Sequence, residues 1–113
     1  MRKALIMSVA ALMTATNAPA QVDTANLKWM AGPPGLPTGA QFAVLAGDPS
    51  KAGVFTIRAR LPAGFVVPPH WHPSDEHVTV LEGEMAFGMG STLDPSKATI
   101  IKAGGFAVAA ARM

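Results

Sequence analysis

The sequence contains neither cysteine nor tyrosine, and aromatic residues make up only 6% of its 113 residues. Without cysteine the chain can form no disulfide, offers no thiolate ligand to a metal and has no cysteine nucleophile. Charged residues are also scarce, at 14%, and no basic run with interleaved aromatic residues occurs. The composition therefore gives no reason to expect a nucleic-acid partner.

The first 20 residues have the layout of a secretory signal peptide. Arg2 and Lys3 precede an apolar run at residues 4–13, which is too short to span a bilayer, and small residues at 18–20 precede Gln21. We expect cleavage after Ala20, export to the periplasm or the medium, and no membrane partner for the mature chain. The alternative is an uncleaved anchor or a buried helix. Without Arg2 and Lys3, seven of the nine Lys and Arg residues remain against seven Asp and Glu, so the mature chain is close to neutral.

A short segment near the middle of the chain combines ligand residues for a metal. His70 and His72 are separated by one residue, and Glu76 follows four positions later. In an extended chain these positions share one face, whereas His77 points to the opposite face. The pattern predicts a metal site made of His70, His72 and Glu76, although a His-x-His pair on a strand is more often a pair of surface histidines and an isolated glutamate an ordinary solvated charge.

The glycines around this segment complete a longer pattern. Gly64 precedes His70 with five residues between them, and Gly83 follows Glu76 after six. At every fixed position this resembles the first signature motif of the cupin superfamily. The resemblance implies that His70, His72 and Glu76 bind one divalent metal ion, with iron, manganese, zinc, nickel and copper as candidates. It also implies a jelly-roll β-barrel.

Residues 102–110 resemble the start of the second cupin motif, with two departures. Ala110 stands where that motif has proline and Arg112 where it has glycine, and Met113 precedes the position of a further histidine ligand. The resemblance therefore implies a cupin domain over residues 27–113 that is incomplete at its C-terminus. Residues 21–26 are expected to form a flexible leader.

The rest of the chain predicts short strands separated by turns. The segments at 27–30, 41–45, 54–61, 76–81, 84–89, 99–101 and 106–110 read as strands, and none after residue 20 shows helical periodicity. In the run 54–61 the apolar residues Phe55, Ile57, Ala59 and Leu61 are expected to face a core, with Arg58 and Arg60 on the solvent side. An Asp-Pro-Ser-Lys-Ala sequence occurs at 48–52 and again at 94–98, and each copy predicts a turn. The predicted class is all-β.

Three functional interpretations follow. In the first the chain is a metal-dependent enzyme that resembles cupin oxygenases or decarboxylases. Met85 and Phe87 would then form the apolar wall of a substrate pocket, although filling the core is the simpler role for both residues. In the second it is a non-catalytic module that binds a metal or a small molecule. In the third it is a truncated cupin without activity. The lack of tyrosine disfavours a metal-free, epimerase-type cupin that uses tyrosine as its acid, and the resemblance also implies a homodimer.

Overall fold

The computed structural model describes residues 22–112. Within them it contains seven β-strands and two short 3-10 helices, and every strand pair is antiparallel. The predicted all-β class is confirmed. None of the helices in this part of the chain is long and apolar enough to cross a membrane. The predicted signal peptide at residues 1–20 lies outside the described residues.

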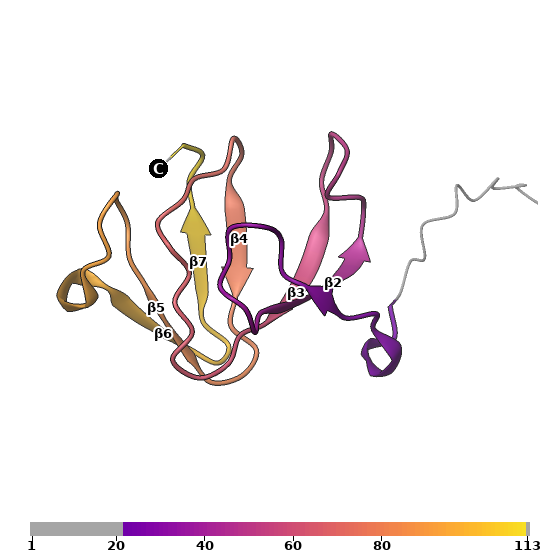
Figure 1. The fold of residues 1–113 in the computed structure, drawn as a ribbon, viewed down its shortest axis with the longest axis horizontal. Helices are drawn as coiled ribbons and strands as arrows, with labels where there is room; N and C mark the ends of the chain where they lie inside the picture. Colours follow the sequence, from indigo (N-terminus) through magenta and orange to yellow (C-terminus); the bar gives the residue numbers. More distant parts are fainter. Residues whose placement is uncertain (1–21, 113) are drawn as a thin grey trace, which may run out of the picture. The chain divides into compact units, whose positions relative to one another are not determined.

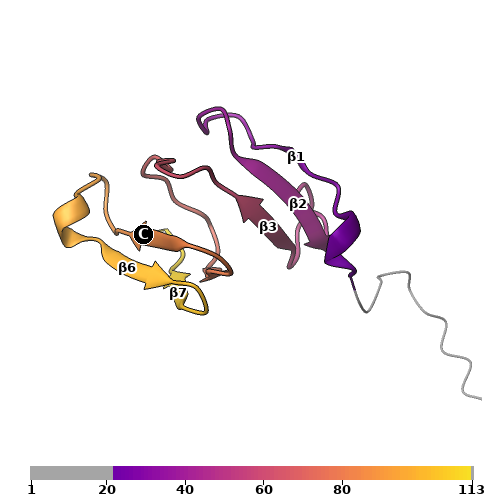
Figure 2. The same cartoon turned by 90° about the horizontal axis from the view of Figure 1, so that it is seen from below.

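The chain divides into two compact units, each described by itself. The first contains residues 22–33 and Thr38–Pro62, and the second contains Pro34–Pro37 and the residues from Ala63 onward. Figure 1 traces the chain from indigo to yellow through both units, and Figure 2 gives the view turned by 90°. The ligand segment predicted from the sequence belongs to the second unit.

The first unit is a single three-stranded sheet. Its strands β1 (Met30–Ala31), β2 (Gln41–Ala46) and β3 (Thr56–Arg60) are hydrogen-bonded in that order. They lie side by side in Figure 2. The helix η1 (Thr24–Asn26) precedes them and is capped by the Asp23 carboxylate, which accepts the Ala25 amide at 2.9 Å. Ala43 in the central strand is fully buried, and Ala40 just before it is nearly so.

The burial expected for the run at 54–61 is wrong. Phe55, Ile57 and Leu61 remain 44%, 37% and 39% exposed, while Arg58 is half-buried. The three strands form one layer with no second layer against it in their own unit, so alternation along β3 does not separate a dry face from a wet one. Arg60 is exposed, as expected, and its guanidinium lies over the Trp29 ring, 3.9 Å from the centroid.

The second unit is built from two antiparallel strand pairs. Strand β4 (Glu76–Thr79) pairs with β7 (Phe106–Ala109), and β5 (Glu84–Phe87) pairs with β6 (Thr99–Lys102). The turn between β6 and β7 joins the pairs, because the Gly104 amide donates to the Val80 carbonyl at 2.7 Å and the Val80 amide donates to the Gly105 carbonyl at 3.0 Å. Val80 and Ile101 are the buried apolar side chains of this unit.

Both copies of the repeated Asp-Pro-Ser-Lys sequence form turns, as predicted. In the first, the Ser50 amide and hydroxyl donate to Asp48 Oδ1 at 2.9 and 2.6 Å. In the second, Asp94 accepts the same two bonds from Ser96 and caps the helix η2 (Pro95–Lys97). These hydrogen bonds from the serine stabilise the ionised carboxylate, so the pKa of each aspartate lies below its ordinary value of 3.8.

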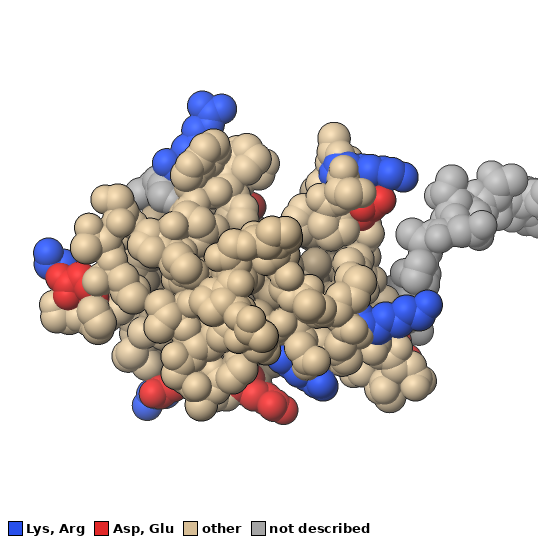
Figure 3. All heavy atoms as spheres, in the orientation of Figure 1, with Lys and Arg blue, Asp and Glu red and all other residues tan. Residues whose placement is uncertain are grey.

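The strands of the described residues form three separate sheets and no closed barrel. The described residues thus form an open β fold, as expected for a barrel that is incomplete. Charged side chains are few on the face drawn in Figure 3, and basic and acidic groups lie next to one another in places. This distribution agrees with the low charge content of the sequence and shows no strongly basic or acidic patch on that face.

Candidate metal centre

The two histidines lie in an irregular loop, and only the glutamate is in a strand. The loop runs through His70 and His72, bends at Pro73 and Ser74, and enters β4 at Glu76. The strand expected at 76–81 does begin at Glu76, and the two histidines lie outside it. Pro68 and Pro69 fix the backbone torsion φ before His70 and provide no amide donors, which favours an irregular approach to the site.

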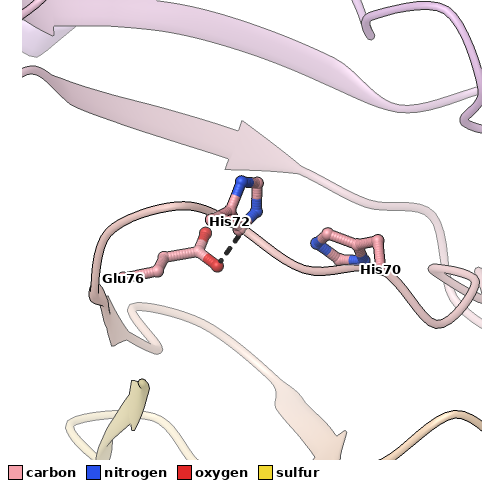
Figure 4. Close-up of side chains that lie close together, drawn as sticks. All are labelled: His70, His72 and Glu76. Atoms are coloured by element: carbon pink, nitrogen blue, oxygen red, sulfur yellow. Dashed lines mark ion pairs between the residues drawn. The ribbon is translucent and has the colours of Figure 1, made fainter. Parts of the chain in front are cut away.

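The loop nevertheless brings the three side chains together. Each of His70, His72 and Glu76 offers one ligand atom, and these atoms all lie within 4.8 Å of one another. His72 Nε2 is 3.6 Å from Glu76 Oε2, the pair joined by a dashed line in Figure 4. In a tetrahedral zinc site with bonds of about 2.0–2.1 Å, ligand atoms are about 3.3 Å apart. The His72–Glu76 pair is therefore close to a binding geometry, and small side-chain movements would complete the set.

The orientation of the His70 ring is fixed by a neighbouring carbonyl. His70 Nδ1 lies 2.8 Å from the Pro68 carbonyl oxygen. Since a carbonyl can only accept a hydrogen bond, Nδ1 must carry a proton in this contact, and a neutral ring then has its free lone pair on Nε2. A backbone carbonyl that orients a ligand histidine in this way is a common feature of metal sites. The two imidazole rings meet edge to face, with centroids 4.9 Å apart and an interplanar angle of 84°.

All three side chains are open to solvent. Those of His72 and Glu76 are 48% and 45% exposed, and His70 is exposed as well. The site is exposed because its histidines belong to a loop and β4 has a hydrogen-bonded neighbour, β7, along one edge only. Water therefore has free access to all three side chains.

A comparison with known proteins identifies the family. Residues 17–94 match the model of the ChrR cupin-like domain. The chain belongs to this family. The match contains His70, His72 and Glu76, so the cupin resemblance recognised from their spacing is confirmed. No curated protein and no solved structure gives a significant match.

In this cupin-like domain, two hydrogen bonds attach the segment after β7 to the ligand loop. The Arg112 amide donates to the His72 carbonyl at 2.9 Å, and the Ala111 amide donates to Asp75 Oδ1 at 2.8 Å. Glu76 is also paired with Ala109 at the start of the β4–β7 ladder. The ligand loop is therefore held by one distant segment through the His72 carbonyl, the Asp75 carboxylate and the backbone of Glu76, which limits the positions that its side chains can take.

Sequence reasoning missed Asp75 and the role of residues 111–112. Asp75 lies between ligands and could be read only as another solvated acid, since its partner is 36 residues away along the chain. The resemblance to the second cupin motif contained one signal for the role of Arg112. Arg112 occupies the glycine position of that motif, and it has a positive φ of 61°, the left-handed conformation that favours glycine.

The remaining candidate residues lie elsewhere in the domain. His77 points away from the ligand group, as predicted, and its ring packs edge to face on Phe106 with centroids 5.5 Å apart. Met85 and Phe87 occupy alternate positions of β5 and are half-buried. Neither lines the pocket next to His70. Their role as the wall of a substrate pocket stays a prediction.

Proposed function

We propose that this cupin-like domain binds a single divalent metal ion through His70, His72 and Glu76. The supporting observation is the convergence of two imidazoles and one carboxylate whose ligand atoms lie within 4.8 Å of one another. Imidazole nitrogen with carboxylate oxygen suits zinc, iron, manganese, nickel and copper, and no thiolate is present to favour a softer ion. Pro68 contributes by holding His70 in the orientation that exposes Nε2.

The proposed site resembles a catalytic metal centre more than a structural one. Three protein ligands leave coordination positions open, whereas structural sites are closed by four. A cation held there would polarise a bound water or an organic ligand and lower its pKa. The side chains of the loop would orient the ion and leave its solvent-facing side free, because His72 and Glu76 are about half exposed. An oxygenase-like or decarboxylase-like activity is one use of such a site, and capture of a metal or small molecule without turnover is the other.

The first experiment is metal analysis of purified protein. Wild type is expected to contain one equivalent of metal, and His70→Ala and Glu76→Ala are expected to lose it. The matched control is His77→Ala, which removes a histidine next to Glu76 that does not face the ligand group. Equal metal content in wild type, His70→Ala and Glu76→Ala would reject the proposed site. Oxygen uptake and carbon dioxide release with candidate substrates would then distinguish the enzyme from the binding module.

Export, a small-molecule partner and a homodimer complete the proposal. Support for export comes from the basic start, the short apolar run and the small residues at 18–20. Cell fractionation and N-terminal sequencing test it, and a mature chain beginning at Gln21 is the expected result. Light scattering on the purified protein tests the homodimer.

A further inference from the structure

A shallow pocket lies next to the proposed metal ligands and shares one of them. It is lined by Pro69, His70, Trp71, Gly90, Ser91 and Arg112, and its volume is about 290 Å³. We call it the Arg112 pocket. Ligand pockets usually begin at about 300 Å³. Its size therefore suits a small organic molecule of a few carbon atoms and excludes a large cofactor.

The lining of the Arg112 pocket combines one permanent cation with apolar walls. Arg112 is the cationic residue, Ser91 adds a hydroxyl, and no aspartate or glutamate lines the pocket. Among residues 22–112 the Arg112 side chain forms no ion pair. A guanidinium offers a planar pair of N–H donors that matches a carboxylate. Pro69 and the exposed Trp71 ring provide apolar surface for a short carbon chain.

The backbone holds Arg112 at this place under unfavourable torsion. Its φ of 61° is the only positive value among the non-glycine residues described. The conformation is kept by the hydrogen bond from its own amide to the His72 carbonyl and by the neighbouring bond from Ala111 to Asp75. Strained residues of this kind often occur at ligand sites, and the side chain thus anchored lines the same pocket as His70.

We infer that the Arg112 pocket binds the carboxylate of a small organic acid beside His70, with Arg112 and Ser91 as its polar contacts. The inference deepens the proposed function and rests on it, because a ligand in this pocket lies next to a metal-binding histidine. It assigns the domain a class of ligand, a short-chain carboxylic acid. A dicarboxylic acid can contact Arg112 with one end and leave the other free for the ion.

The test titrates succinate into the zinc-loaded full chain and follows the indole N–H signal of Trp71 by nuclear magnetic resonance. Succinate is expected to shift this signal, and Arg112→Gln is expected to weaken binding about tenfold, as for loss of one charged hydrogen-bonding partner. Arg112→Lys should retain part of the affinity because it keeps the charge. The charge-matched control is Lys28→Gln, which removes an exposed cation from the other unit and should leave binding unchanged.

Two further probes define the chemistry of the ligand. Succinamide has the same carbon chain without charge and should not shift the Trp71 signal. Inorganic phosphate tests for a general anion site. Equal succinate affinity in wild type and Arg112→Gln, equal affinity for succinamide, or tighter Arg112-dependent binding of phosphate would each overturn the inference.

Metal content measured on the same samples separates this inference from the proposed function. Arg112→Gln should keep its zinc, because Arg112 supplies no ligand atom to the metal group. If wild type takes up neither zinc nor iron, manganese, nickel or copper, the proposed metal site fails, and the titration is repeated on the metal-free protein. An Arg112-dependent shift by succinate there still supports the pocket, and no shift rejects both.

Discussion

Metal binding should stabilise the folded domain by an amount that depends on His70. An ion at 100 times its dissociation constant stabilises a protein by about 2.7 kcal/mol if it binds only the folded state. Structural zinc sites with four ligands are worth about 10–16 kcal/mol, or about 3 kcal/mol per ligand. His70→Ala should therefore weaken binding about 100-fold. At the same ion concentration the stabilisation then falls to about 0.4 kcal/mol.

The structure reduces the expected shift in melting temperature. For a domain of this size 1 kcal/mol corresponds to about 4–8 °C, so 2.7 kcal/mol would correspond to about 10–20 °C. All three ligands belong to one short segment, His70 to Glu76, so the unfolded chain keeps them close and also binds some metal. Metal binding would stabilise the folded domain because Glu76 belongs to β4 and because the His72 carbonyl accepts a hydrogen bond from the Arg112 amide. We therefore expect a shift of about 5–10 °C.

The assay is thermal unfolding followed by circular dichroism, with and without zinc, on wild type, His70→Ala and His77→Ala. The His77→Ala variant loses the contact with Phe106, so its melting temperature without metal can be lower than that of wild type. Its increase on adding zinc should nevertheless equal that of wild type, because His77 is outside the ligand group. No shift in wild type, or the same shift in His70→Ala, would refute the reasoning.

Three further predictions concern stability measured by urea unfolding. Gly105→Ala should destabilise the domain by about 2–3 kcal/mol, because the added Cβ would lie 2.8 Å from the Lys102 carbonyl oxygen. Gly104→Ala should cost only about 1 kcal/mol, because its Cβ would meet open space and only the φ of 84° is unfavourable. A larger loss for Gly104→Ala than for Gly105→Ala would be inconsistent with this packing. Arg112→Gly should stabilise the domain by about 0.5–1 kcal/mol through relief of the positive φ, and a loss of stability would argue against that strain. The hydrogen bonds from Ser50 hold the pKa of Asp48 below its ordinary value of 3.8. They therefore stabilise the folded state above pH 3.8, and this stabilisation is lost as the pH falls through the pKa of Asp48 in the folded state. Ser50→Ala should therefore be less stable than wild type at neutral pH, and a difference that persists unchanged in strong acid would contradict this.

The ligand group could be found from the sequence because its members are neighbours along the chain. The intervals between His70, His72 and Glu76 restrict where their side chains can go, whether the segment is a regular strand or a loop. The exact path of the backbone through this segment could not be predicted. Alternation suggested an extended strand, but Pro68, Pro69 and Pro73 remove backbone donors and keep the histidines outside the β4–β7 ladder.

Burial was predicted less well than strand position. In the range from Gln41 to Ala109, all six expected strands begin and end within two residues of those observed, because turn residues mark their limits. The apolar side chains of the run at 54–61 are exposed all the same, since burial requires a second layer that alternation in one strand does not supply.

The sequence by itself determined the all-β class, the family and the three candidate ligand residues, because each depends on local spacing and residue type. Only the tertiary structure decided that Asp75 and His72 hold Ala111 and Arg112, and that Arg112 lines a pocket with His70. These contacts join residues far apart in the chain, and they lie next to the end of the β4–β7 ladder. Local spacing carries no information about such pairing, which depends on the packing of the whole unit.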